Sequence, residues 1–225
     1  DEEALGYMGL EGMDPEVNRR DLGSDPLAFY QKRLNLSREL WDRLRYLEPA
    51  APIRTTFLYN NLMFTAAGQV IEELGGQTWE QAVQRRIFDP LGMSRSTLTI
   101  EDNLKGPEPA VPYSERRDSA VLYRQPYYTA EVAIAPAGAI NSSVQDLSHW
   151  VIALMNGGKF EGRQVIPEAV LRETMAPSLA MPNAALEARG CAENLNQYYG
   201  MGRWVSSYRG HLLALHGGDL PGFHS

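Results

Sequence analysis

Apolar residues recur at spacings of three and four over residues 62–74, which predicts an amphipathic helix that buries one face. Asn60 and Asn61 precede this run, and Gly75-Gly76 follow it. The helix is therefore expected to begin near Asn60 or Asn61 and to end at the glycines. Tyr59 then lies at or just before the helix N-terminus.

Shorter helical patterns lie before and after this helix, and each is bounded by a capping residue, a glycine pair or a proline. They are expected to begin at Ser37, Thr78, Ser143 and Pro167, and to end before Pro49, at Asp89-Pro90, at Gly157-Gly158 and before Pro177. Residues 99–136 are rich in proline and polar groups and show no sustained period, which predicts a long loop.

The pattern changes after residue 196. Residues 198–205 and 211–216 are expected to form two strands joined around Arg209-Gly210. Two strands alone are marginal in water, and no internal repeat supplies others. The expectation is therefore one partial domain over residues 1–225, a piece of a larger fold that is incomplete at both ends. About 1–196 would be mostly helix and loop, and 197–225 would supply strands of the sheet.

The composition is that of an ordinary globular protein, with 44% hydrophobic and 22% charged residues, which excludes collagen-like and disordered classes. The net charge of −7 argues against a nucleic-acid or anionic-membrane partner, because both attract cationic surfaces. No apolar run is long enough to span a membrane, and no signal peptide is visible. The single cysteine, Cys191, cannot form an internal disulfide.

Common catalytic motifs are missing from the chain: there is no Gly-x-Ser-x-Gly, P-loop, His-Glu-x-x-His or Cys-x-x-Cys. Two short motifs remain, Tyr59-Asn60-Asn61 at a helix start and His216-Gly217-Gly218 at the end of an apolar strand. Other segments accompany them in a fixed order. These are Ile87-Phe88-Asp89-Pro90-Leu91-Gly92-Met93, Pro136-Ala137-Gly138-Ala139-Ile140-Asn141-Ser142-Ser143, Met155-Asn156-Gly157-Gly158 and Tyr199-Gly200-Met201-Gly202.

Taken together, these segments resemble the serine hydrolases of the class C β-lactamase and penicillin-binding-protein superfamily over roughly residues 37–225. The resemblance implies an α/β (α+β) fold of the β-lactamase/transpeptidase type, a helical lobe packed on an antiparallel sheet flanked by helices. It also implies a cofactor-free acyl-enzyme mechanism that uses a Ser-x-x-Lys motif. No serine here has lysine three positions later. The nucleophile is therefore expected before Asp1, and this chain alone should be inactive.

The resemblance also implies roles for residues of the two motifs. Tyr59 would transfer protons to and from the nucleophile and leaving group, and Asn61 would bond the substrate carbonyl or the lysine. The backbone N–H of Asp219 would contribute to an oxyanion hole. Gly217 and Gly218 would let the substrate lie close to the strand.

His216 departs from the family pattern, because β-lactamases and transpeptidases usually have lysine there. An imidazole, with a reference pKa of about 6.5, is a weaker permanent anchor for a substrate carboxylate. This favours an esterase, amidase or D-peptidase acting on a small-molecule or peptide substrate. Relatives are commonly exported, so a periplasmic or secreted location is expected; the sequence leaves the oligomeric state and the choice among ester, amide and lactam open.

Other interpretations stay open at this point. The chain could belong to a non-catalytic binding or structural relative, or to an all-helical interaction protein if residues 198–216 are not strand. A metal site of His211, His216, His224 and Asp219 is disfavoured, because alternation puts His211 and His216 on opposite faces of a strand. Cys191 could be a nucleophile or a small packed side chain. Tyr127 and Tyr128 could line the substrate cleft or cover the core.

Overall fold

The computed structural model describes residues 38–116, 119–127, 134–181 and 193–225. The chain divides into two compact units. The first unit comprises the described residues up to Leu47, together with 60–147 and 219–225; the second comprises 48–59 and 148–218. This division does not test the expectation of one partial domain over residues 1–225, which stays a prediction.

In the first unit, α3 (Asn61–Gly75) is the helix that the apolar spacing predicts. The Asn60 side chain accepts a hydrogen bond of 2.8 Å from the Leu62 N–H and caps the N-terminus. Gly76, at φ 60°, ends the helix in the left-handed conformation. Both predicted boundaries are confirmed, and Tyr59 lies two residues before the helix. A helix over residues 38–44, also predicted, precedes it in the chain.

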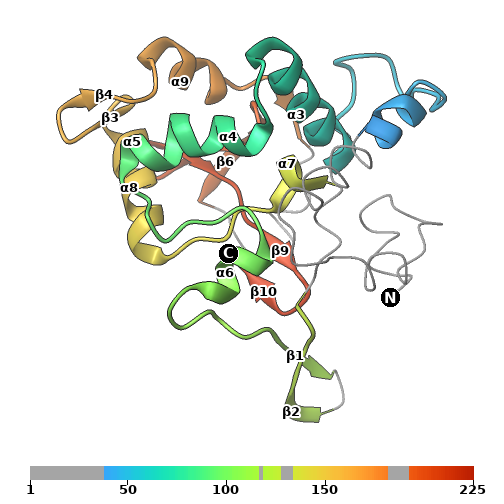
Figure 1. Cartoon of the computed structure of the whole chain (residues 1–225). Coiled ribbons are helices and arrows are strands. Elements are labelled where there is room, and N and C mark those ends of the chain that lie inside the picture. Colours follow the sequence, from blue (N-terminus) through green and yellow to red (C-terminus); the bar gives the residue numbers. More distant parts are fainter. Residues whose placement is uncertain (1–37, 117–118, 128–133, 182–192) are drawn as a thin grey trace. The chain divides into compact units, whose positions relative to one another are not determined.

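The capping box of Thr78 and Gln81 is present at the start of α4 (Trp79–Val83). The predicted stop at Asp89-Pro90 is wrong. The helix continues through a π-helical segment, η1 (Gln84–Phe88), and α5 (Asp89–Leu91), and ends at Gly92 with φ 63° (Figure 1). The wider turn of η1, in which the Asp89 N–H donates to the Gln84 carbonyl, relaxes the steric conflict that a proline ring makes with the preceding turn.

The predicted loop over residues 99–136 is wrong in part, because it contains a helix and a hairpin. α6 (Ile100–Lys105) is capped by the Thr99 hydroxyl, and β1 (Tyr113–Arg116) pairs antiparallel with β2 (Ser119–Arg124). The neighbouring side chains of Val121 and Leu122 are both exposed. Because neither face of the hairpin is buried, the sequence lacks the apolar alternation by which strands are recognised.

The start of α8 (Val144–Met155) and a short hairpin also belong to the first unit. The Ser143 hydroxyl accepts from the Asp146 N–H at the start of this helix, as predicted. The buried Asp146 carboxylate accepts 2.8 Å hydrogen bonds from the Arg95 N–H and the Ser96 hydroxyl. It thereby ties the helix start to a distant loop. β9 (Asp219–Leu220) pairs with β10 (Phe223–His224).

α3 lies against α7 (Ala135–Gly138), and the two backbones approach most closely at Gly68. A Cβ atom built on Gly68 would lie 2.3 Å from Cγ of Pro136. A proline ring cannot swing aside as a flexible side chain can, so this position requires glycine.

We expect Gly68→Ala to lower the free energy of unfolding by about 1–3 kcal/mol, the usual cost of overpacking. Gly75→Ala in the same helix should be neutral or slightly stabilising, because a Cβ there makes only ordinary contacts with Gln77. Urea unfolding monitored by circular dichroism measures both. Equal effects for the two variants would contradict the packing constraint at Gly68.

In the second unit, α8 ends at Gly157-Gly158 as predicted, and a hairpin of β3 (Lys159–Phe160) and β4 (Arg163–Gln164) follows. α9 (Glu168–Thr174) follows Pro167, also as predicted. A four-stranded antiparallel sheet has the order β5 (Leu179–Ala180), β6 (Asn194–Tyr199), β7 (Trp204–Tyr208) and β8 (His211–Leu215).

The predicted strand over residues 198–205 is wrong as a single element, because a turn divides it between β6 and β7. The Gly200 N–H donates to the Arg203 carbonyl at 2.8 Å, and Gly202 has φ 69°. A Cβ on Gly200 would approach the Thr174 carbonyl oxygen to 2.8 Å, so the chain turns where it passes the end of α9. The second strand, with its turn at Arg209-Gly210, is confirmed.

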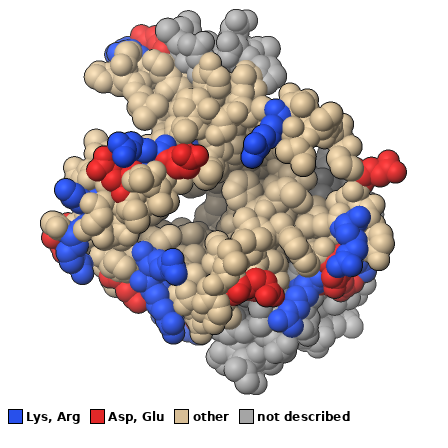
Figure 2. All heavy atoms as spheres, turned by 90° about the horizontal axis from the view of Figure 1, so that it is seen from above, with Lys and Arg blue, Asp and Glu red and all other residues tan. Residues whose placement is uncertain are grey.

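Acidic and basic side chains lie beside one another on the face shown in Figure 2. Exposed ion pairs join Arg172 to Glu168 and Arg209 to Glu193, for example. Such pairs contribute little to stability. Across the described segments, no helix is both long and apolar enough to cross a membrane.

Candidate functional site

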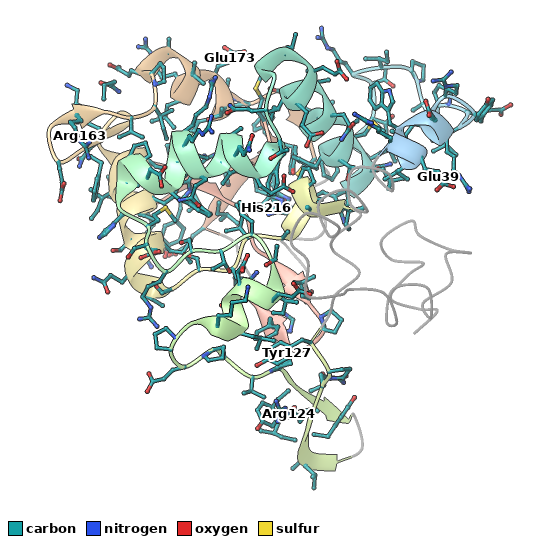
Figure 3. All side chains as sticks on the ribbon, viewed as in Figure 1. Glu39, Arg124, Tyr127, Arg163, Glu173 and His216 are labelled. Carbon is teal, nitrogen blue, oxygen red and sulfur yellow. The ribbon has the colours of Figure 1, made fainter. Side chains whose placement is uncertain are left out.

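The strand register of the second unit gathers aromatic rings beside His216. Tyr199 on β6 is opposite Trp204 on β7, and Trp204 is opposite Leu215 on β8. His216 follows Leu215 directly (Figure 3). The Trp204 and His216 ring centroids are 4.3 Å apart, and Trp204 meets Tyr199 edge to face at 5.5 Å. Tyr199 on β6, Trp204 on β7 and His216 just after β8 thus form one cluster.

Tyr59 joins this cluster from the segment that precedes α3. Its ring is nearly parallel to that of Trp204, with centroids 6.0 Å apart and an interplanar angle of 13°. It meets Tyr199 edge to face at 6.3 Å, and Phe57 packs on Tyr199 at 5.1 Å. These are favoured aromatic geometries, so ring packing attaches the segment to the sheet.

The two motif residues that the sequence singles out are in contact. The Tyr59 hydroxyl oxygen lies 3.4 Å from Nε2 of His216, although the residues are 157 positions apart. The other ring nitrogen of His216, Nδ1, hydrogen-bonds the carbonyl oxygen of Gly217. Tyr59 is 45% exposed and His216 is also exposed, so a ligand can reach the pair.

Tyr199 lies deeper in the cluster. Its hydroxyl oxygen is buried and has no hydrogen-bond partner among the described residues. Burial, with a smaller contribution from the neighbouring Tyr59, raises the pKa of Tyr199 to about 12. Tyr199 is therefore a neutral phenol at physiological pH. Its proximity to Tyr59 and His216 was not predicted, because it depends on the register of strands distant in sequence.

Arg203 is the basic residue beside Trp204 in sequence, at the turn between β6 and β7. Its guanidinium carbon lies 5.8 Å from the centroid of the Trp150 ring, a cation–π contact. Burial lowers the pKa of the guanidinium from its ordinary value. The charged guanidinium of Arg203 thus packs against a ring of α8.

The remaining predicted site residues are divided between the two units. Gly217 and Gly218 follow His216 directly, whereas Asn61 and Asp219 belong to the first unit. Asn61 opens α3, and its backbone carbonyl lies 3.4 Å from the Thr65 hydroxyl. Asp219 opens β9, and its carboxylate lies 3.2 Å from Nδ1 of His224. The catalytic and binding roles of these residues stay predictions.

Three of the alternative interpretations concern a metal site, the role of Tyr127 and Tyr128, and the role of Cys191. Among the residues that the structure describes, no group of three or more His, Cys, Asp or Glu could hold a metal. Tyr127, which Figure 3 labels, stacks on Phe223 and donates to the Ala110 carbonyl at 3.1 Å, which favours a packing role. Cys191 and Tyr128 lie outside the described residues.

Comparison with known proteins identifies the class. The sequence pattern of the beta-lactamase family matches residues 8–225, and the chain belongs to that family. Its fold is of the β-lactamase/transpeptidase type: 91% of the chain superposes on the octameric penicillin-binding protein homologue from Pyrococcus abyssi, with TM-score 0.66, 20% identity and 41% of that chain covered. A D-stereospecific amidohydrolase from Streptomyces sp. gives TM-score 0.62 and 24% identity over 93% of this chain and 56% of that one.

One curated relative is considerably more similar in sequence. Unguisins hydrolase ungD from Aspergillus violaceofuscus is 42% identical over 116 residues, which make up 50% of this chain and 20% of that protein. The chain thus spans about a fifth of the length of this relative.

The buried hydroxyl of Tyr199 generates a stability prediction. We expect Tyr199→Phe to leave the free energy of unfolding of this chain unchanged or to raise it by about 1 kcal/mol, because an unsatisfied buried group is removed without loss of packing. Tyr46→Phe, at a tyrosine that is 80% exposed, should change it by less than about 0.5 kcal/mol. Urea unfolding measures both. A loss above 1 kcal/mol for Tyr199→Phe alone would show that the hydroxyl is hydrogen-bonded.

Proposed function

We propose that this protein is a serine hydrolase that cleaves an ester, amide or lactam bond through an acyl-enzyme, with Tyr59 as the proton-transfer residue. The observation that carries the proposal is the 3.4 Å approach of the Tyr59 hydroxyl to Nε2 of His216. Two motifs far apart in the sequence meet there, as an active site of this family requires. Membership of the beta-lactamase family supports the same reaction class.

The nucleophile in this proposal is a serine of a Ser-x-x-Lys motif in a part of the polypeptide before Asp1. No serine in the chain has lysine three positions later, so the motif cannot lie within residues 1–225. The greater length of the relatives agrees with further sequence. In the absence of that segment the chain would be inactive. We further propose that the whole protein is exported, to a periplasm or to the medium.

The reaction needs a group that moves a proton at the nucleophile and at the leaving group. Tyr59 is suited to this task because the residue is 45% exposed while its ring packs on Trp204 and Tyr199. The N–H of Asp219 would stabilise the oxyanion, a contribution worth about 2.7–4 kcal/mol in other hydrolases. Asn61 would orient the substrate carbonyl, and Gly217-Gly218 would leave space for the substrate.

The substrate in this proposal is a small molecule or peptide with a cleavable acyl group. The Aspergillus relative is named as a hydrolase of unguisins, and the Streptomyces structure as a D-stereospecific amidohydrolase. These names support amide bonds as the first class to screen, and esters as the second. The histidine at position 216, in place of a permanently charged lysine, favours substrates that do not need a carboxylate anchor.

The natural polypeptide that contains this chain should be labelled by a fluorophosphonate on an upstream serine, and the 225-residue chain should not. Peptide mapping by mass spectrometry locates the adduct. A label on a serine within residues 1–225 would contradict the placement of the nucleophile. Labelling of neither polypeptide would favour a non-catalytic binding or structural relative.

Tyr59→Phe in the natural polypeptide should lower kcat for an activated ester by about 10²–10⁴, because the proton transfer is removed while ring packing is kept. Tyr113→Phe, at an exposed tyrosine on β1, is the matched control and should leave kcat unchanged. Steady-state hydrolysis of p-nitrophenyl esters measures both. A wild-type rate in Tyr59→Phe would remove Tyr59 from the mechanism.

A further inference from the structure

The hydrogen bond of His216 to its neighbour determines which ring nitrogen carries the proton. A backbone carbonyl oxygen only accepts hydrogen bonds, so the contact between Nδ1 and the Gly217 carbonyl requires a proton on Nδ1. In the neutral ring, Nε2 then has a free lone pair. Nε2 is the atom that lies 3.4 Å from the Tyr59 hydroxyl. The phenol therefore donates to the imidazole.

We propose that His216 is a catalytic base in its own right, taking the proton of Tyr59 through Nε2 while Tyr59 takes the proton of the nucleophile. This assignment rests on the proposed hydrolase function and gives His216 a different role from a substrate anchor. The pair acts as a relay in which the phenol hydroxyl connects the nucleophile to the imidazole.

The reference acidities explain why a relay suits this pair. A phenol ionises with a reference pKa of about 10, whereas an imidazole titrates near 6.5, close to neutral pH. A base whose pKa lies near the working pH is both available and strong enough to accept a proton. Passing the proton on to Nε2 as it arrives spares Tyr59 from existing as a free phenolate. The imidazole then carries the positive charge that lysine carries elsewhere in the family.

The nucleophile's oxygen forms a bond to the acyl carbon, its proton moves to the Tyr59 oxygen, and the original Tyr59 proton moves to Nε2. The carbonyl π electrons move to the carbonyl oxygen. When the tetrahedral intermediate collapses, the bond to the leaving group breaks and the leaving group takes a proton from Tyr59. Tyr59 recovers its proton from His216, and hydrolysis of the acyl-enzyme by water repeats the sequence.

Aromatic rings pack beside both members of the pair. Trp204 contacts both rings, with centroids 6.0 Å from Tyr59 and 4.3 Å from His216. The titratable side chains whose rings face His216 among the described residues are Tyr59 from the segment before α3 and Tyr199 from β6. Tyr199 is neutral at physiological pH, so it adds no charge that competes for the proton.

The test compares His216→Gln with wild type in the natural polypeptide. The glutamine oxygen can still accept a hydrogen bond from Tyr59, but it cannot take a proton. We expect kcat for an uncharged p-nitrophenyl ester to fall at least about 100-fold with KM changed less than about threefold. The matched control is His211→Gln, at the exposed start of β8, which should keep the wild-type kcat.

The pH profile supplies a second readout. A relay needs neutral His216, so the wild-type kcat should fall when the solution is acidic enough to protonate the ring, and His216→Gln should lose this fall. If His216 instead anchored a substrate carboxylate, it would need to be protonated, and catalysis would weaken as the pH rises rather than as it falls. KM for anionic substrates would then rise with pH, and His216→Gln would change KM and leave kcat intact. This second pattern would overturn the relay.

Two outcomes distinguish a failure of the relay from a failure of the proposed hydrolase function. Wild-type protein that hydrolyses esters and takes the fluorophosphonate, while His216→Gln keeps its kcat, contradicts the relay alone. Wild-type protein that does neither contradicts the hydrolase and the relay together. If His216→Gln loses its circular dichroism signal, ¹⁵N NMR of histidine-labelled wild type decides. Protonated Nδ1 with unprotonated Nε2 in the neutral ring supports the relay, and the reverse tautomer overturns it.

Discussion

The antiparallel register of β6, β7 and β8 is the constraint on which the candidate site depends. It sets Tyr199 opposite Trp204 and Trp204 opposite Leu215, so that His216 emerges beside both rings. A slip of one residue in any of these pairings would turn the affected side chains to the other face of the sheet. Tyr59 is then held by ring packing on Trp204 and Tyr199 rather than by a strand of its own. The register of the sheet thus determines how close the Tyr59 hydroxyl comes to Nε2 of His216.

In this arrangement, the residues that pack the site differ from the residues that are proposed to transfer protons. Trp204 and Tyr199 supply aromatic packing surfaces, and the Tyr199 hydroxyl is buried, whereas the residues Tyr59 and His216 are exposed. Aromatic rings restrict motion over a large contact area with few rotatable bonds. The His216 ring packs against Trp204, and each of its two nitrogens has its own hydrogen-bond partner.

Local signals in the sequence predicted the elements that carry the motifs. Asn60, Gly76 and the Thr78–Gln81 capping box act through neighbouring backbone groups, and the structure has all three where they were expected. Predictions failed where the decisive contact is not local. Pro90 is accommodated by the π turn before it, and the strand at 198–205 is divided because Gly200 passes the end of α9.

Some residues of the candidate site were likewise predicted from local motifs, and others were not. Tyr59 and His216 were found through their motifs, and the structure brings them into contact. Tyr199 and Trp204 were missed as neighbours of the pair, because only strand register places them there. The spacing of Tyr199 and Trp204 in the sequence does not indicate that they lie near Tyr59 and His216. The roles of Asn61, Gly217, Gly218 and Asp219 rest on the family resemblance.

A crystal structure of the natural polypeptide with a phosphonate adduct would test the account most directly. The account predicts phosphorus on a serine outside residues 1–225, with its oxygen within hydrogen-bond distance of the Tyr59 hydroxyl and Nε2 of His216 on the other side of that hydroxyl. An adduct remote from Tyr59, or a Tyr59 hydroxyl turned away from His216, would contradict it.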